Sequence, residues 1–277
     1  MYKFFISFVF LLASLLLSAQ GIKEYYVPSN GVNLYVKSMG NGEPLIMLHG
    51  AMVDMNDWEY QTPELSRSYN LILIDTRGHG KSSFDNLPLS YEKMADDVVN
   101  VMNYLKIDSA HILGFSDGGN TALYLALQHP EKIRKMIIIG SNLQPTPDAV
   151  YPYFLDKVRD WNVKDMEDAL KQRFKQNPNP QSFPDFIRAM QILLLTHPDL
   201  TTQDLASIKT PTLVMVSDYD LVTLSHTISI FESLPNAYLS VIPGAKHYNI
   251  REKPQIVNAN ILDFLKYPFN KIDRFGK

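Results

Sequence analysis

Residues 110–119, AHILGFSDGG, decide the fold. The first six are mostly apolar, as in a strand buried on both faces, and a helical pattern follows the glycines. Gly114 to Gly118 match G-x-S-x-G, the sequence of a sharp strand-to-helix turn that lifts a serine hydroxyl above a sheet. The alternative is a glycine-rich turn with a capping serine, but the position between strand and helix favours Ser116 as a nucleophile.

A serine hydroxyl is a poor nucleophile and needs a base, which in turn needs an orienting acid. The elbow turn requires the chain order serine, acid, histidine. His247 lies in a loop after the last predicted strand, and both Asp218 and Asp220 follow the strand before it, so either aspartate satisfies the order. We favour Asp220, because an acid that reaches across to His247 fits a loop better than a strand end. Asp218 then caps the turn.

The negative oxygen that forms during attack on a carbonyl needs two backbone donors. One is expected to be the amide of Asp117, directly after the nucleophile. The other is expected from the loop His49-Gly50-Ala51-Met52, where glycine lets the backbone approach the site. Ala51 and Met52 both remain candidates, and we favour Ala51. His49 is interpreted as a structural residue that holds the loop.

The pattern along the chain predicts an α/β fold, with a mostly parallel sheet, helices on both faces and a helical insertion that caps the strand ends. The core is expected at residues 21–141 and 211–277, and the cap at 142–210. Strands are predicted at 25–27, 32–37, 44–48, 71–75, 110–115, 136–140, 211–217 and 237–242, and core helices at 58–66, 90–106, 121–128, 225–234 and after Pro254.

The first twenty residues have the layout of a secretory signal peptide, with Lys3, an apolar run and small residues near Ala19 and Gln20. The alternative is a membrane anchor, but the apolar run is shorter than the roughly 20 residues that a spanning helix needs. We therefore expect cleavage after Ala19 or Gln20, a secreted or periplasmic mature protein, and no stable membrane insertion.

Composition excludes several classes of site. The chain has 277 residues, a net charge of −3 and no cysteine, so it has no disulfide, no catalytic thiol and no zinc–thiolate site. No basic block suggests nucleic acid. The other histidines lack close paired ligand spacing, so we expect no metal, and a serine mechanism requires no cofactor. The expected partner is a small-molecule substrate.

Four motifs in order resemble the α/β-hydrolase superfamily: His49-Gly50, D-x-R-G-x-G-x-S from Asp75 to Ser82, the elbow around Ser116, and G-x-x-H ending at His247. The resemblance covers the mature chain except the insertion. It implies the triad Ser116, Asp220 and His247, the two amide donors and a cap domain. The family acid usually follows a glycine in G-x-x-D, and Ser217 stands in that place here, which leaves the choice of aspartate open.

The Ser-Asp-Gly-Gly elbow is similar to that of valacyclovir hydrolase and related amino-acid ester hydrolases. Two interpretations of the Asp117 side chain follow. Either the carboxylate turns away and is stabilised by the helix N-terminus, or it pairs with a cationic substrate group such as the ammonium of an amino-acid ester. The aromatic residues Tyr151, Tyr153, Phe154 and Trp161 are candidates for lining the substrate pocket or for the core of the cap; of these we favour Tyr151 and Trp161 as substrate contacts.

These residues predict acyl transfer to water. Ser116 would attack a small-molecule ester with His247 as base, and water would then cleave the acyl-enzyme. Lactone, amide or C–C bond hydrolysis would use the same triad, because the fold does not choose among them. A different class of protein, which binds a ligand with this triad but turns it over negligibly, is the other alternative.

Overall fold

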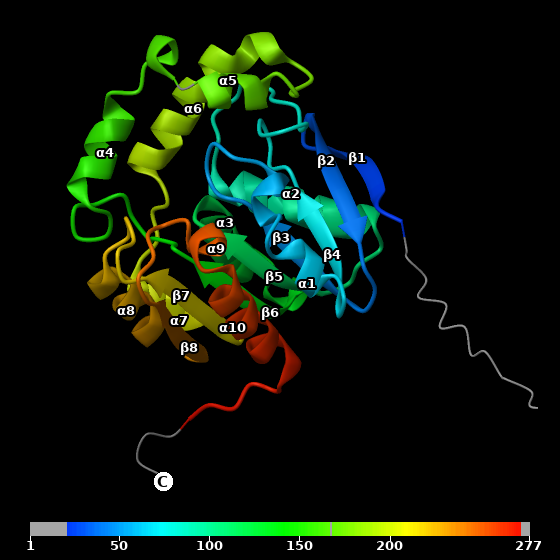
Figure 1. Ribbon diagram of the computed structural model, residues 1–277, viewed down its shortest axis with the longest axis vertical. Helices are drawn as coiled ribbons and strands as arrows, with labels where there is room; N and C mark the ends of the chain where they lie inside the picture. The colour runs from blue at the N-terminus through cyan, green and yellow to red at the C-terminus, as the bar shows by residue number, and fades with distance from the viewer. Residues whose placement is uncertain (1–20, 167, 273–277) are drawn as a thin grey trace, which may run out of the picture.

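The computed structural model describes residues 21–166 and 168–272, which form a sheet flanked by helices with a helical segment at one end (Figure 1). The sheet has eight strands in the order β1-β2-β4-β3-β5-β6-β7-β8. β1 and β2 pair antiparallel, as do β2 and β4, and every other pair is parallel. The predicted fold class is thereby confirmed. The strands are β1 (Lys23–Ser29), β2 (Val32–Met39), β3 (Glu43–Leu48), β4 (Tyr69–Ile74), β5 (Ala110–Phe115), β6 (Ile133–Ile139), β7 (Thr212–Ser217) and β8 (Ala237–Ile242).

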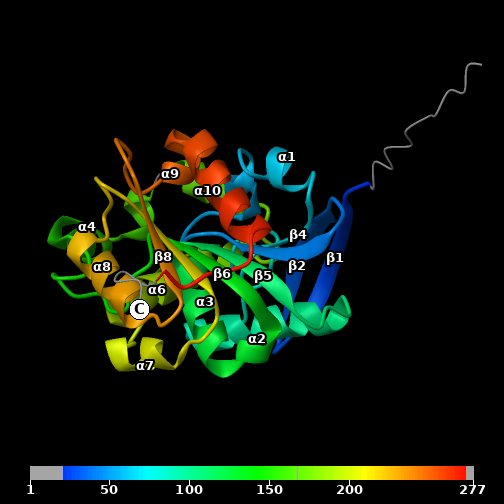
Figure 2. The same cartoon turned by 90° about the horizontal axis from the view of Figure 1, so that it is seen from below.

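The central strands are apolar throughout because both faces of the sheet are covered. On β3, Ile46 and Leu48 belong to the apolar cluster beneath one set of helices, and Leu45 and Met47 belong to the cluster on the opposite face. This alternation follows from the two-residue period of a strand. Figure 2 shows α2, α3 and α7 on one side of the sheet and α1, α9 and α10 on the other.

The core helices are α1 (Thr62–Leu65), α2 (Tyr91–Tyr104), α3 (Asp117–Gln128), α8 (Leu224–Ser233), α9 (Asn249–Glu252) and α10 (Pro254–Lys266). Ser90 caps α2 as expected, since its hydroxyl accepts a hydrogen bond from the Lys93 amide. The helix predicted at 58–66 is instead a 3₁₀ turn, Met55–Trp58, followed by the short α1. Pro63 explains the division, because proline is favoured in the first turn of a new helix.

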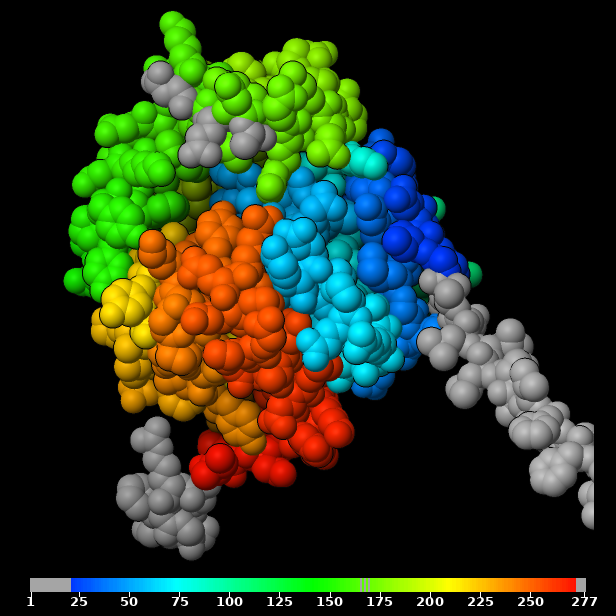
Figure 3. Space-filling view, in the orientation of Figure 1, coloured from blue at the N-terminus to red at the C-terminus, as the bar shows by residue number. Residues whose placement is uncertain are grey.

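The helical insertion lies between β6 and β7. It contains α4 (Pro152–Arg159), α5 (Asp168–Phe174), α6 (Phe183–Thr196) and α7 (Thr202–Ser207). α4, α5 and α6 lie together at the top of the view in Figure 1, and Figure 3 shows their atoms, in green, against those of the core. α7 packs instead beside α3 and α8, within a core layer.

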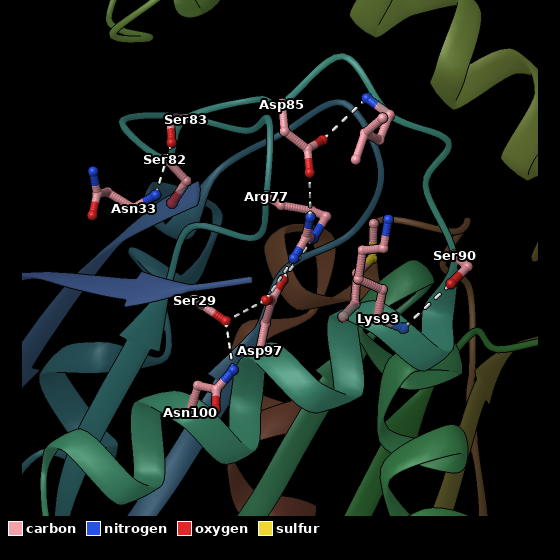
Figure 4. A network of polar contacts seen from close by, with 12 residues as sticks. Ser29, Asn33, Arg77, Ser82, Ser83, Asp85, Ser90, Lys93, Asp97 and Asn100 are labelled. Atoms are coloured by element: carbon pink, nitrogen blue, oxygen red, sulfur yellow. Dashed lines mark hydrogen bonds and ion pairs between the residues drawn. The ribbon is translucent and has the colours of Figure 1, made fainter. Parts of the chain in front are cut away.

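One buried ion-pair network fixes the loop between β4 and α2 (Figure 4). The guanidinium of Arg77 is fully buried and donates two hydrogen bonds of 2.7 Å to the Asp97 carboxylate, one from Nε and one from Nη2. Its Nη1 also donates to Asp85 at 3.2 Å. Ser29 donates to Asp97 at 2.5 Å and accepts from Asn100 at 2.8 Å. The Asp97 carboxylate therefore joins the end of β1, α2 and this loop through its hydrogen bonds to Ser29 and Arg77.

Within residues 21–166 and 168–272, no helix is long and apolar enough to span a membrane. The predicted signal peptide, residues 1–20, lies outside the described residues and stays a prediction.

Replacing Arg77 with methionine should lower the free energy of unfolding by about 3–5 kcal/mol, because Asp97 would stay buried without its cation. Arg159→Met is the matched control: it removes an exposed ion pair with Asp156 and should stay within about 1 kcal/mol of wild type. Urea denaturation at pH 7 measures both. Equal losses in the two variants would contradict a central role for the buried pair.

Candidate active site

The turn from β5 into α3 holds Ser116 in a strained backbone conformation, with φ 52° and ψ −118°. Two glycines make this turn possible. A Cβ on Gly118 would lie 2.1 Å from the carbonyl oxygen of Leu48, and a Cβ on Gly114 would lie 2.3 Å from that of Gly118. The first turn of α3 therefore crosses directly over the ends of β3 and β5, and Ser116 stands where the sheet ends.

The structure brings Ser116, His247 and Asp220 together in one chain of hydrogen bonds. Ser116 Oγ and His247 Nε2 are 3.0 Å apart, and His247 Nδ1 and Asp220 Oδ1 are 2.6 Å apart. The imidazole ring packs against Phe115, with ring centroids 4.9 Å apart, and against Gly140, where a Cβ would lie 2.9 Å from the ring. This packing fixes the ring between the hydroxyl and the carboxylate.

Asp220 is a buried anion with several donors. Its Oδ1 accepts from the amide of Val222 at 3.2 Å, and its Oδ2 accepts from that of Ser217 at 3.3 Å. Burial acts to raise the pKa of the Asp220 carboxyl, but His247 and these two amides together lower the pKa below its ordinary value. The carboxylate is therefore ionised at neutral pH and stabilises positive charge on the imidazole.

Asp218 has a different position. Its side chain is exposed and accepts hydrogen bonds from the amides of Gly244 at 2.9 Å and Ala245 at 3.2 Å, which lower the pKa of its carboxyl. These bonds hold the start of the loop that carries His247. Of the two candidate acids, the geometry joins only Asp220 to the imidazole.

The loop after β3 approaches Ser116 closely, since a Cβ on Gly50 would lie 3.3 Å from Ser116 Cβ. Among the described residues, neither the amide of Ala51 nor that of Asp117 has a hydrogen-bond acceptor. The amide of Met52, in contrast, donates to His79 Nε2 at 3.2 Å. Ala51 and Asp117 thus keep amides for a ligand, and Met52 does not.

His49 and His79 are buried and support this loop. His49 Nδ1 lies 2.7 Å from the carbonyl oxygen of Gly50 and its Nε2 accepts from the Thr76 amide at 3.0 Å, so it has the neutral Nδ1–H form. Burial, with the neighbouring His49, holds the pKa of His79 well below its usual range. Both histidines therefore hold the loop as neutral hydrogen-bonding groups.

A small cavity of about 40 Å³ lies above Ser116, between the core and the helical insertion. Tyr151 and Trp161 do not line it. Tyr151 is 47% exposed at the start of α4, and Trp161 packs against the main apolar cluster. Phe154 does line it. The cavity walls also hold residues that sequence reasoning did not single out, namely Tyr91, Asn142, Pro145, Val150, Leu155, Leu194, His197 and Leu221.

The carboxylate of Asp117 also lines this cavity, and it is 7% exposed. Its Oδ1 accepts a hydrogen bond from the Tyr91 hydroxyl at 3.0 Å, and its buried Oδ2 has no partner among residues 21–166 and 168–272. Burial raises the pKa of the Asp117 carboxyl to about 6, against the opposing effects of Tyr91 and His247. The Asp117 side chain thus lines the same cavity as Ser116, with one carboxylate oxygen unsatisfied.

No group of three or more potential metal ligands occurs in the part of the chain that the structure describes. The cavity is lined by the Ser116 hydroxyl, the Asp117 carboxylate and the His197 imidazole, and most of its other lining residues are apolar. His247 is linked to it through the contact with Ser116.

Comparisons with known proteins agree with the α/β fold. The model of the alpha/beta hydrolase fold family matches residues 43–170. RutD of Caulobacter sp. (strain K31) is 31% identical over 231 residues, which cover 75% of this chain and 85% of that protein. Serine hydrolase BPHL of Mus musculus is 28% identical over 251 residues, 87% of this chain and 85% of that protein. Among solved structures, Est816, described as an N-acyl homoserine lactone degrading enzyme, has a TM-score of 0.71 and 27% identity, and covers 87% of this chain and 100% of its own.

The chain therefore belongs to the α/β-hydrolase superfamily, a family of hydrolytic enzymes. This membership explains the mostly parallel sheet, the elbow at Ser116 and the similarity along most of the chain.

Proposed function

We propose that this protein hydrolyses a small-molecule ester through an acyl-enzyme, with Ser116, His247 and Asp220 as its catalytic residues. The observation that carries the proposal is the continuous contact from Ser116 Oγ to His247 Nε2, at 3.0 Å, and from His247 Nδ1 to Asp220, at 2.6 Å. This is the arrangement in which an acid orients a base and the base activates a nucleophile.

In the proposed first step, Ser116 Oγ attacks the ester carbonyl carbon while its proton passes to His247 Nε2. The amides of Ala51 and Asp117, which have no acceptor in the described part of the chain, donate to the carbonyl oxygen as it becomes negative. The C–O bond to the leaving alcohol then breaks, and the alcohol takes the proton from His247. Water repeats the sequence on the acyl-enzyme and releases the carboxylic acid.

Lactone, amide and C–C bond hydrolysis are open to the same residues, and the names of related proteins include a lactone-degrading enzyme. A panel of short p-nitrophenyl esters, lactones and amides would rank these reactions by kcat/KM. Labelling of Ser116 by a fluorophosphonate without multiple turnover of any substrate would instead favour the binding-protein alternative.

We propose further that the substrate is an ester with a cationic group, such as an amino-acid ester. The reason is the unsatisfied Oδ2 of Asp117, a buried acceptor on the wall of the cavity beside Ser116. An ammonium group would complete its hydrogen bonding and remove the repulsion between this carboxylate and the developing oxyanion.

Ser116→Ala and His247→Ala should each reduce kcat by a factor on the order of 10⁴ or more, and the double variant should be little worse than either. The reason is that both residues act in the same step, so the loss of either one already removes the contribution of the other to kcat. Steady-state kinetics on a short ester measure this, with circular dichroism to confirm folding. Multiplicative losses in the double variant would mean that the two residues do not share a mechanism.

Asp220→Asn should lower kcat by about 10³- to 10⁴-fold, because the amide neither stabilises the imidazolium nor selects the same tautomer. Asp218→Asn is the matched control, two residues away, and should keep most of the activity. The same kinetic assay compares them. The reverse ranking would transfer the acid role to Asp218.

Wild type should prefer an α-amino ester to its des-amino analogue by about tenfold or more in kcat/KM at pH 7, as expected for a hydrogen bond to a charged group. Asp117→Asn should abolish the preference while it still hydrolyses the neutral analogue. Asp148→Asn, which changes an exposed acid at the start of the insertion, should retain it. A wild type without preference, or an Asp117→Asn variant that keeps it, would refute the amino-ester assignment.

A further inference from the structure

Tyr91, the first residue of α2, reaches the active site from a helix that carries none of the proposed catalytic residues. It is fully buried and lines the same cavity as Ser116. Its hydroxyl donates to Asp117 Oδ1 at 3.0 Å, and its ring stacks on Tyr124, with ring centroids 5.8 Å apart. Packing on all sides thus directs one hydrogen-bond donor at one oxygen of the Asp117 carboxylate.

The two oxygens of that carboxylate are therefore unequal. Oδ1 is satisfied by Tyr91, and Oδ2 has no partner in the described part of the chain. The other ionisable groups at the cavity are His247, from the loop after β8, and His197, from the end of α6. No lysine or arginine is among the residues that line it.

We propose that Tyr91 is a positioning residue for substrate selection: by holding Oδ1 it orients the Asp117 carboxylate and leaves Oδ2 for the ammonium group of the substrate. This inference rests on the proposed amino-ester hydrolysis and adds a residue that this function did not include.

Because the Tyr91 hydroxyl is uncharged, its hydrogen bond stabilises the ionised Asp117 carboxylate only moderately. Burial raises the pKa of Asp117 to about 6, with the Tyr91 hydrogen bond and the nearby His247 acting in the opposite direction. The carboxylate is therefore anionic above pH 6 and protonated below it. The preference for a cationic ester should be present at pH 7 and lost as the pH falls through about 6.

Tyr91→Phe tests the role of the hydroxyl, since it keeps the stacked ring. Without its donor the carboxylate should titrate about one pH unit higher. The measured quantity is the ratio of kcat/KM for an α-amino ester to that for its des-amino analogue, from pH 4.5 to about 8.5. Each value for the α-amino ester is divided by the fraction of the substrate that is protonated at that pH. The des-amino analogue, measured at each pH, removes the effects that are common to both substrates.

The midpoint of the ratio against pH should move upward by about one unit in Tyr91→Phe, so that the preference at pH 6 falls about fivefold. Tyr124→Phe is the matched control. It removes the hydroxyl of the stacked neighbour, which accepts from the Asp199 amide and does not contact Asp117. It should leave the midpoint unchanged. A purely structural effect of Tyr91→Phe would lower both kcat/KM values and leave the midpoint in place, which would overturn the proposal.

A second measurement separates this inference from the proposed function. The ¹³C chemical shift of the Asp117 carboxyl, assigned by its loss in Asp117→Asn, reports its titration without any turnover. A higher pKa of the Asp117 carboxyl in Tyr91→Phe, but not in Tyr124→Phe, would support the positioning role of Tyr91. If no ester were hydrolysed, that result would still hold and only the proposed function would fail. Equal titration in wild type and Tyr91→Phe would overturn the role of Tyr91 while leaving ester hydrolysis intact.

Discussion

The close crossing of α3 over the ends of β3 and β5 is the constraint on which the site depends. Only a residue without Cβ fits at Gly118, which faces the carbonyl of Leu48. The crossing forces Ser116 to a positive φ, a strain of about 1–3 kcal/mol that the surrounding structure must offset. The Ser116 amide donates to the Ile139 carbonyl oxygen at 2.7 Å, which ties the strained residue to β6. Because β3 and β5 are paired, the segments that follow them leave the same sheet edge, and Ala51 and Asp117 line one cavity there.

The core and the insertion contribute different chemistry to the cavity. The Ser116 hydroxyl and the Asp117 carboxylate come from the core, whereas α4 and α6 contribute mainly apolar side chains such as Phe154, Leu155 and Leu194. The His197 imidazole, at the end of α6, is the polar exception. A cavity of about 40 Å³ holds only a few water molecules, so a substrate of more than a few atoms requires movement of the side chains that line it. This division explains how one catalytic core serves proteins with diverse substrates, since the insertion alters the walls without moving the reacting groups.

Sequence predicted the sheet well because its central strands are buried on both faces and are therefore continuous apolar runs. It also indicated Ser116 and His247, whose motifs depend on local turn geometry and chain order. It could not separate Asp218 from Asp220 firmly, because both follow β7 and only the side-chain directions distinguish them. The sequence did not predict a role for Tyr91. That residue precedes the elbow by 26 positions, and its contact depends on how α2 packs against α3, which no local pattern encodes.

In the proposed mechanism, the Asp117 amide stabilises an oxyanion while the buried Asp117 carboxylate carries a negative charge close to it. The repulsion between these two negative charges requires an explanation. Under the proposed mechanism, two negative charges about 5 Å apart would repel by roughly 3 kcal/mol at an effective dielectric constant near 20. A lysine or arginine in the place of Tyr91 would neutralise Asp117 permanently and remove the repulsion for every substrate. A phenol does not. It stabilises the carboxylate enough to be ionised near neutral pH but leaves its charge uncompensated, and the compensation must come from the bound molecule. Under the proposed function, a neutral donor at this position turns an unfavourable charge into a means of selecting cationic substrates.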